Sequence, residues 1–330
     1  MNFLKDYLAV IFLCFTSLTI WAQISQETLP VHQDYLSDNI FLVHPAAAGI
    51  GEHGKVRAAI RMEGFGLANS PQIQTLNLHG TFTEESQAAF GILLMKNASN
   101  LAFNQQALRL TYAYHLPLDK EKRFEQLSFG LSMAGVQSTI EQNVFDNFGS
   151  SSILQPTFQL NADFGASYHL KGLSSYFTVK NIRLSGENSL FTIDNAFNPT
   201  NYVLGLAYFF GDEAKFQYEP SVLFQSKREV GEQVLDVNFK AYKMFKNAQM
   251  WAAISYRDAF VETDTSIGTQ FIAAMFGLNT KKMLFAYTYS SQMGQITPTI
   301  GVYHQLTVGI NILYREPKQF ANPNINGAVF

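Results

Sequence analysis

The stretch FQLNADFGASYHL, residues 158–170, decides the fold of this chain. In an extended strand, alternate side chains point to opposite faces. Residues 158–170 are enough to cross a bilayer as a tilted strand, which takes about 9–11 residues. Strands of soluble sheets usually have only about 5–6. The stretch therefore predicts a membrane-spanning β-strand that ends in a turn at Lys171-Gly172. One face is apolar and the other almost wholly polar, with Phe158, Leu160, Ala162, Phe164, Ala166, Tyr168 and Leu170 on the first and Gln159, Asn161, Asp163, Gly165, Ser167 and His169 on the second.

The overall composition is consistent with such strands. Of the 330 residues, 47% are hydrophobic and only 15% are charged, against about 25% charged in an ordinary soluble domain. The formal net charge is -3 and no basic block is present, so neither nucleic acid nor a polybasic membrane anchor is indicated. The single cysteine, Cys14, lies in the predicted leader. The mature protein is therefore expected to have no disulfide and no cysteine-based metal site.

Residues 1–22 have the layout of a secretory signal peptide. Lys5 precedes an apolar run from Leu8 to Ile20, and Ala22 follows shortly after. Cleavage is expected after Ala22, although Ile20 is bulkier than the small residue that usually stands at that position. The competing interpretation is a single-span anchor. It is disfavoured because about 13 apolar residues fall short of the roughly 20 that a spanning helix needs.

Extended runs then follow one another as far as Tyr314. An even number of antiparallel strands is typical of single-chain outer-membrane barrels. We therefore predict an all-β fold: a transmembrane antiparallel β-barrel of about fourteen strands, within a range of about 12 to 16, with short periplasmic turns and long extracellular loops. The expected strands are Val56 to Glu63, Ile73 to Phe82, Ala88 to Lys96, Ala107 to Leu116, Phe124 to Gly135, Phe158 to Leu170, Leu173 to Asn181, Tyr202 to Phe210, Phe216 to Gln225, Val234 to Met244, Met250 to Arg257, Thr269 to Leu278, Met283 to Ser290 and His304 to Tyr314.

The lengths of the connections indicate an orientation. If the N-terminus is periplasmic, the connections after even-numbered strands lie in the periplasm, where turns are short. These are all brief, among them Lys171-Gly172 and Phe245-Lys246-Asn247. The other set includes Val136 to Pro156 and Ile182 to Asn201, two stretches of about twenty residues that we expect to be outer loops. The expected organisation is a signal peptide at 1–22, a periplasmic or plug segment at 23–54, the barrel at 55–314 and a periplasmic tail at 315–330.

The motif search yields no catalytic, cofactor-binding or metal-binding residue. Gly49, Gly51, Gly54 and Lys55 spell both G-x-G-x-x-G and G-x-x-x-x-G-K. A phosphate-binding loop needs a preceding strand and a following helix. Here a Pro-Ala-rich segment precedes and a strand is expected to follow, which favours a lead-in to the first strand over nucleotide binding. We therefore expect no enzymatic activity and no cofactor.

The predicted polar faces carry scattered histidines and charges. His115 and His169 lie on such faces without metal-ligand spacing, so lumenal hydrogen bonding is expected instead. The charged residues are of mixed sign and spread out, unlike the clustered like charges at the constriction of a selective pore. We expect them to be solvated or paired with one another in the lumen. They are Arg109, Asp163, Lys180, Glu219, Asp236, Lys240 and Arg257.

The start of the mature chain resembles a known family. Gln33-Asp34, Tyr35-Leu36-Ser37 and then Pro45-Ala46-Ala47-Ala48-Gly49 resemble the opening of the PorP/SprF family of Bacteroidetes type IX secretion. Its members have a Q-D-x-x-[FY]-S-x-Y-like segment and an N-P-A-x-A-G-like one. Here His44 stands where Asn is usual, and Asp38-Asn39 interrupts the Ser-x-Tyr pattern.

The resemblance implies an outer-membrane barrel, exported by its signal peptide, that assists secretion or surface attachment of cargo such as gliding adhesins through cargo C-terminal domains. It implies as partners outer-membrane lipid, that cargo and other type IX components, including periplasmic ones, and it transfers no catalytic residue. Two other classes stay open. One is an outer-membrane channel or transporter for hydrophobic or nutrient solutes, with Gln23 to Gly54 as a plug, and the other is a barrel enzyme. A soluble extracellular β-protein is the least favoured interpretation.

Overall fold

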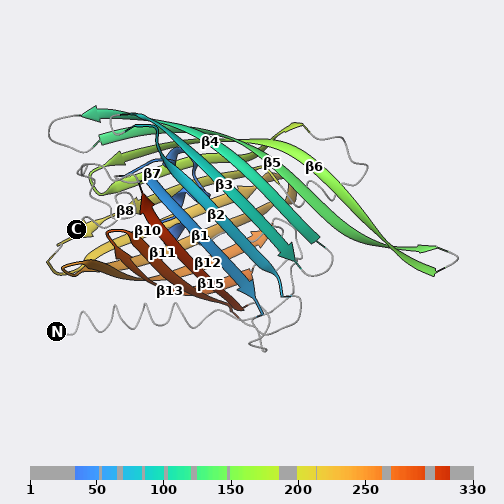
Figure 1. The fold of residues 1–330 in the computed structure, drawn as a ribbon. Coiled ribbons are helices and arrows are strands. Elements are labelled where there is room, and N and C mark those ends of the chain that lie inside the picture. The colour runs from blue at the N-terminus through green and yellow to red at the C-terminus, as the bar shows by residue number, and fades with distance from the viewer. Residues whose placement is uncertain are drawn as a thin grey trace.

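A closed barrel of antiparallel strands surrounds a short N-terminal segment (Figure 1). The structure is a computed structural model. It describes residues 34–51, 54–64, 70–83, 86–99, 103–119, 125–146, 149–185, 199–212, 214–261, 269–293 and 302–312. The strands are β1 (Gly54–Glu63), β2 (Gln72–Thr81), β3 (Ala88–Ser99), β4 (Phe103–Asp119), β5 (Glu125–Asp146), β6 (Gly149–Leu170), β7 (Leu173–Ser185), β8 (Asn201–Tyr208), β9 (Phe210–Gly211), β10 (Gln217–Lys227), β11 (Glu232–Met244), β12 (Ala248–Val261), β13 (Thr269–Thr280), β14 (Met283–Gln292) and β15 (Val302–Ile312).

The sheet closes on itself, and β1 pairs with β15 at the seam. β10 pairs with both β8 and the two-residue β9, so β8 and β9 are parts of one wall strand that is interrupted at Phe209. The fifteen labelled strands therefore make fourteen wall strands, which confirms the predicted barrel. Closure leaves no unpaired edge in the wall, as a sheet in hydrocarbon requires.

The alternation in residues 158–170 has the predicted meaning. Phe158 and Phe164 are 61% and 39% exposed on the outer surface, whereas Asn161 and Asp163 are each 1% exposed inside. The same outward display recurs around the barrel, for example at Leu131, which is 56% exposed. An outward apolar band around a polar interior is the pattern of an outer-membrane barrel.

The hairpin of β5 and β6 corrects one prediction. Val136 to Pro156, expected as an outer loop, is mainly strand, because β5 runs to Asp146 and pairs there with Gly149 at the start of β6. The two strands project beyond their neighbours (Figure 1). Outside a bilayer both faces of a hairpin contact water, so its strands need no polar–apolar alternation. That alternation was the signal used to place the strand ends.

The second expected outer loop, Ile182 to Asn201, is partly strand as well. β7 continues to Ser185 and β8 begins at Asn201, and residues 186–198 of this stretch lie outside the described residues. The predicted turn at Lys171-Gly172 is confirmed: it joins β6 to β7, and Lys171 has a φ of 50°. We call the end of the barrel that carries this turn, residues 245–247 and residues 281–282 the short-turn end.

Three short 3₁₀ helices precede the barrel: η1 (Asp34–Leu36), η2 (Ile40–Leu42) and η3 (Pro45–Ala47). A fourth, η4 (Arg228–Val230), connects β10 and β11. The predicted signal peptide at 1–22 and the predicted tail at 315–330 lie outside the described residues. Among the residues that the structure describes, no helix is long and apolar enough to cross a membrane.

Candidate functional site

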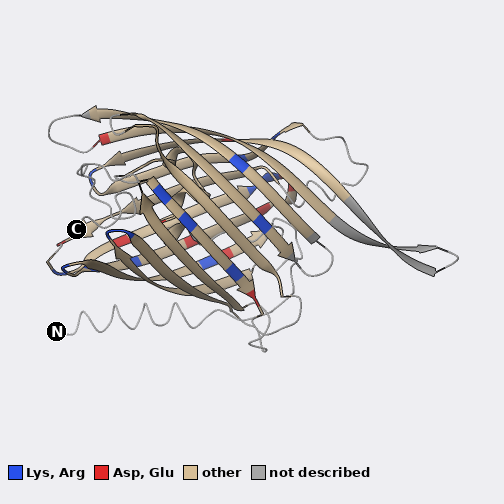
Figure 2. Ribbon diagram, in the orientation of Figure 1, with Lys and Arg blue, Asp and Glu red and all other residues tan. Residues whose placement is uncertain are grey.

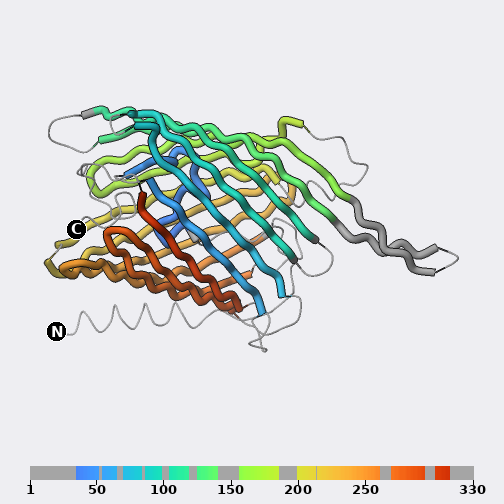
Figure 3. Tube along the Cα trace, viewed as in Figure 1, coloured from blue at the N-terminus to red at the C-terminus, as the bar shows by residue number. Residues whose placement is uncertain are grey.

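Residues 34–51, which we call the lumenal segment, lie inside the barrel (Figure 3). Its side chains are buried almost without exception, with Ser37, His44 and Ala46 to Ala48 at 0% exposure. The segment contains every described residue of the motifs that resemble PorP/SprF. These motifs therefore occupy the centre of the structure, surrounded by the polar faces of the wall strands.

The local sequence explains the compact path of this segment. Pro45 opens η3, where its missing N–H and fixed φ suit the first position of a helical turn. The His44 amide donates to the Ile40 carbonyl oxygen at 3.0 Å, which links η2 to the next turn. Gly49 has a φ of 68°, a conformation that glycine adopts without strain. The chain thus folds into successive tight turns within the lumen.

Asp38 fixes the segment to β1. Its two carboxylate oxygens each lie 2.9 Å from a cation, Oδ1 from Lys55 Nζ and Oδ2 from Arg57 Nη2. All three side chains are at most 3% exposed. Arg57 also donates to Asn311 Oδ1 of β15 at 2.9 Å. A buried carboxylate needs such partners, because its desolvation would otherwise be very costly. The cluster joins the lumenal segment to both strands of the seam.

Tyr35 attaches the lumenal segment to a second strand, β11. Its hydroxyl donates to Asp236 Oδ2 at 3.1 Å and accepts from Asn238 Nδ2 at 3.0 Å. Asp236 is held in turn by Arg257, which donates from Nε to Oδ1 at 2.6 Å and from Nη2 to Oδ2 at 2.8 Å. Burial and the adjacent Asp236 raise the pKa of Tyr35, so its hydroxyl keeps the proton that it donates.

Side chains of the wall also form hydrogen bonds with backbone groups of the lumenal segment. Lys240 Nζ donates to the Leu36 carbonyl oxygen at 2.7 Å, and Lys180 Nζ donates to that of Leu42 at 2.8 Å. The Gly49 amide donates to His79 Nδ1 at 3.0 Å. Short helical turns leave carbonyl and amide groups without partners of their own. The inward lysines and histidines supply those partners, so the turns are stable away from water.

His44 of the lumenal segment packs against β7. Its Nδ1 lies 2.8 Å from Thr178 Oγ1, and its ring stacks on Tyr176 with 4.7 Å between the ring centroids. Burial, together with the nearby charge of Lys180, lowers the pKa of His44 from 6.5 to about 3. The imidazole is therefore neutral at neutral pH.

Small wall residues let the segment approach the strands closely. A Cβ atom on Gly130 of β5 would fall 2.4 Å from the Ala46 amide nitrogen, and one on Gly165 of β6 would fall 2.9 Å from Pro45 Cγ. A Cβ on Gly91 of β3 would fall 2.4 Å from the ring of Phe41. Because these positions carry no side chain, the turns pack directly on the backbone of the wall.

Several predictions about the polar faces are confirmed. His169 Nε2 lies 2.8 Å from the Tyr176 hydroxyl, and His115 Nδ1 lies 2.9 Å from Ser128 Oγ. Arg109 forms an ion pair with Asp163, with 2.7 Å between Nε and Oδ2. Asp236 and Arg257 are likewise paired with each other. Lys180 and Lys240 instead donate to backbone carbonyl oxygens of the lumenal segment, and Glu219 accepts from the Tyr242 hydroxyl. Figure 2 shows how few charged residues the wall carries in all.

The sequence did not indicate the partners of Asp38, nor the apolar part of the lumen. Trp251, Met275 and Leu284 are inward-facing and belong to one buried cluster with Leu36 and Leu42 of the lumenal segment. These strands alternate poorly, since both of their faces include apolar residues. The poor alternation is the only sequence signal for this contact, and it gives no position for the segment.

The glycine-rich motif has a structural role. A strand, not a helix, follows Gly54, and Lys55 is paired with Asp38. Gly49 and Gly51 both have positive φ, at 68° and 98°. Within the described part of the chain, no group of three or more His, Cys, Asp or Glu residues is placed to hold a metal ion.

Comparison with known proteins identifies the family. Type IX secretion system membrane protein PorP/SprF is the family whose profile matches, over residues 24–310. No match was found among curated protein sequences. Similar solved structures include a Pseudomonas aeruginosa FadL homologue, at 10% identity over 79% of this chain and 90% of that one with a TM-score of 0.49. The CymD monoaromatic hydrocarbon channel is also 10% identical, over 86% of this chain and 93% of its own, with a TM-score of 0.44.

The family match covers the lumenal segment and almost the whole barrel. A closed barrel with an apolar outer band and this family together support an outer-membrane component of type IX secretion. The resemblance inferred from the first motifs is therefore confirmed, despite the departures at Asp38, Asn39 and His44. The chain belongs to the PorP/SprF family of type IX secretion system membrane proteins.

Proposed function

We propose that this barrel assists the secretion or surface attachment of cargo through cargo C-terminal domains, and that the lumenal segment acts as a plug that keeps the barrel closed to solutes. The observation that carries the proposal is the attachment of this segment to two separate wall strands, which have four other strands between them. Asp38 is joined to β1, and Tyr35 is joined to β11. A plug held at both positions favours a docking role over free diffusion through the barrel.

The surfaces at the two ends suit such a role. The β5–β6 hairpin extends the barrel at the end opposite the short turns (Figure 1), where it offers an extended surface to an exported protein. The short-turn end would then face periplasmic components of the machinery, with the N-terminus on that side. We propose gliding adhesins as an example of the cargo and periplasmic proteins as partners, and we propose no catalytic activity.

Deletion of the gene tests the proposal against the solute-channel alternative. We expect loss of secretion and surface display of C-terminal-domain cargo, with uptake of small hydrophobic and nutrient solutes unchanged, and restoration of display by the wild-type gene. Unchanged cargo display together with reduced solute uptake would contradict the proposal and support the channel.

Purified full-length protein in planar bilayers gives a second measurement. The wild-type barrel should conduct little, and variants that detach the lumenal segment should conduct more. A large, steady conductance of the wild-type barrel would contradict the closed state, although a closed barrel alone would not establish a role in secretion. The cargo experiment is therefore needed beside it.

A further inference from the structure

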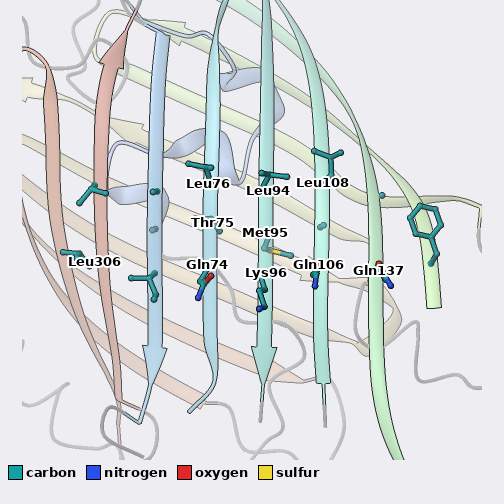
Figure 4. A pocket seen from close by; sticks show the side chains of 17 residues that line it. Gln74, Thr75, Leu76, Leu94, Met95, Lys96, Gln106, Leu108, Gln137 and Leu306 are labelled. Carbon is teal, nitrogen blue, oxygen red and sulfur yellow. The ribbon is translucent and has the colours of Figure 1, made fainter. Parts of the chain in front are cut away.

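A groove of about 960 Å³ runs across the outer face of β1 to β5 (Figure 4). One side is a row of leucines, Leu76, Leu94 and Leu108, which are register neighbours on β2, β3 and β4 and are each 46% exposed. Thr75, Met95 and Ala107, which follow the leucines or precede them by one residue on the same strands, also line the groove. The leucine side of the groove is therefore apolar and lies on the outer surface of the barrel.

The other side of the groove is polar. Gln74, Lys96, Gln106 and Gln137 are register neighbours on four successive strands, and Figure 4 shows them in one row beside the leucines. Lys96 provides an ammonium group and the glutamines provide amide donors. No carboxylate of the described residues lies within ion-pair distance of Lys96. Within the described part of the chain, the row thus presents hydrogen-bond donors and one positive charge that no carboxylate compensates.

The position of this row along the strands restricts what can occupy it. Lys96 lies near the end of β3, and Gln74 and Gln106 lie near the same end of β2 and β4, away from the short-turn end. A lysine at the border of the apolar band is far less destabilising than one at the bilayer midplane. The polar row therefore suits the level of lipid headgroups, and the leucine row suits the level of acyl chains.

We propose that this groove is a binding site for an acyl lipid with a phosphate in its headgroup. The phosphate lies at Lys96 and accepts hydrogen bonds from the flanking glutamines, and an acyl chain lies along the leucine row. Gly135 and Ala58 are part of the lining and leave room for the chain at either end. The polarity of the ligand, charged at one end and apolar beyond it, matches the order of the two rows along the strands.

Binding of two lipids with the same acyl chains tests the charge. Full-length protein in detergent is titrated with dioleoyl phosphatidic acid or with dioleoylglycerol, and lipid retained on the barrel is counted by native mass spectrometry. We expect the wild-type protein to prefer the phosphate lipid by about tenfold in apparent Kd, the effect of one charge-assisted contact. K96Q should reduce the preference to within about twofold, and K96R should retain it.

Two further variants separate the parts of the site. K171Q changes an exposed lysine in the turn at the short-turn end, and it should leave the preference unchanged. G135L places a side chain in the groove and should weaken the binding of both lipids. The wall should tolerate this change, because a Cβ at position 135 would meet only the Phe158 ring, at 3.3 Å. Heat-modifiable migration in gels confirms that each variant forms the barrel.

Equal affinity of the wild-type barrel for the two lipids would overturn the proposal, and so would an unchanged preference in K96Q. Competition by inorganic phosphate as effective as phosphatidic acid would show a site for the anion alone, with no role for the groove. Retention of a protein in place of lipid, with the same dependence on Lys96, would assign the groove to a partner chain. None of these results depends on whether the barrel acts in secretion.

Discussion

Gly130 of β5 lies directly beneath Pro45 of the lumenal segment: a Cβ atom at position 130 would fall 2.3 Å from the Pro45 carbonyl carbon. No real side chain tolerates such a distance, and the atoms involved are backbone, which cannot rotate away. The close packing of the lumenal segment on β5 therefore depends on a missing side chain in the wall.

Replacement of Gly130 with valine should detach the lumenal segment while the barrel persists, because overpacking costs about 1–3 kcal/mol and is relieved by movement of the segment. Ser37 is fully buried, so Ser37→Cys in a Cys14→Ala background reports this movement by maleimide labelling. We expect slow labelling in that background and at least about tenfold faster labelling once Gly130→Val is added. Gly135→Ala on the outer face of the same strand is the control, and equal labelling in all three proteins would contradict the close contact.

Neutralising Asp38 should destabilise the protein strongly. Asp38→Asn leaves Lys55 and Arg57 buried without their carboxylate, and loss of one partner of a buried ion pair costs about 3–5 kcal/mol. The midpoint of urea unfolding in lipid vesicles, followed by tryptophan fluorescence, measures the change. Asp212→Asn, in an exposed turn, should shift stability by no more than about 0.5 kcal/mol. Similar midpoints for the two variants would show that the Asp38 cluster contributes little.

Acid should open the barrel through His44. The docked segment lowers the pKa of His44 from 6.5 to about 3, so docking is favoured by the neutral ring. The contribution of His44 to docking is complete above pH 6.5 and decreases as the pH falls from 6.5 towards 3. Over this range the equilibrium constant for docking should fall by up to about tenfold per pH unit. Conductance in planar bilayers should therefore increase on acidification over this range. His44→Asn, which has no titrating ring, should give a shallower dependence. An identical pH profile in the variant would exclude His44 as the titrating group.

The apolar band predicts a dependence on depth. Leu131 lies in the middle of the exposed apolar run of β5, and Leu118 lies beside the end of β4. Leu131→Lys should cost about 2–4 kcal/mol and Leu118→Lys about 0–1, because the cost of a lipid-facing lysine falls from the midplane to the interface. Unfolding in vesicles measures both. The reverse order, or equal costs, would show that the band is not centred in the bilayer.

Local patterns were sufficient for the wall of the barrel. Alternate residues of a strand point to opposite faces. The sequence alone therefore placed Asp163 and His169 inside the barrel and Phe158 and Phe164 outside it. Mixed charges on the polar faces likewise indicated solvation or pairing in the lumen, and the structure shows that Arg109 and Asp163 form one such pair. The strand ends were less accurate wherever the chain leaves the bilayer, as in the β5–β6 hairpin. There the environment no longer distinguishes the two faces, and alternation loses its meaning.

The attachments of the lumenal segment could not be predicted in this way. Asp38 and Asn39 looked like interruptions of a family motif, yet Asp38 binds Lys55 and Arg57, and Asn39 Oδ1 accepts from Asn77 Nδ2 at 2.9 Å. Tyr35 and Asp236 are 201 residues apart in sequence. No periodicity relates such positions, because the contact exists only after the strands have closed around the segment.

The sequence by itself determined a fourteen-stranded barrel with an apolar outside, since strand geometry converts a two-residue period into two faces and the bilayer selects between them. Only the tertiary structure decided that residues 34–51 fill the lumen, which partner each buried charge has, and which wall positions must lack a side chain. Those facts depend on distances between residues far apart in the chain, and closure of the barrel is what sets those distances.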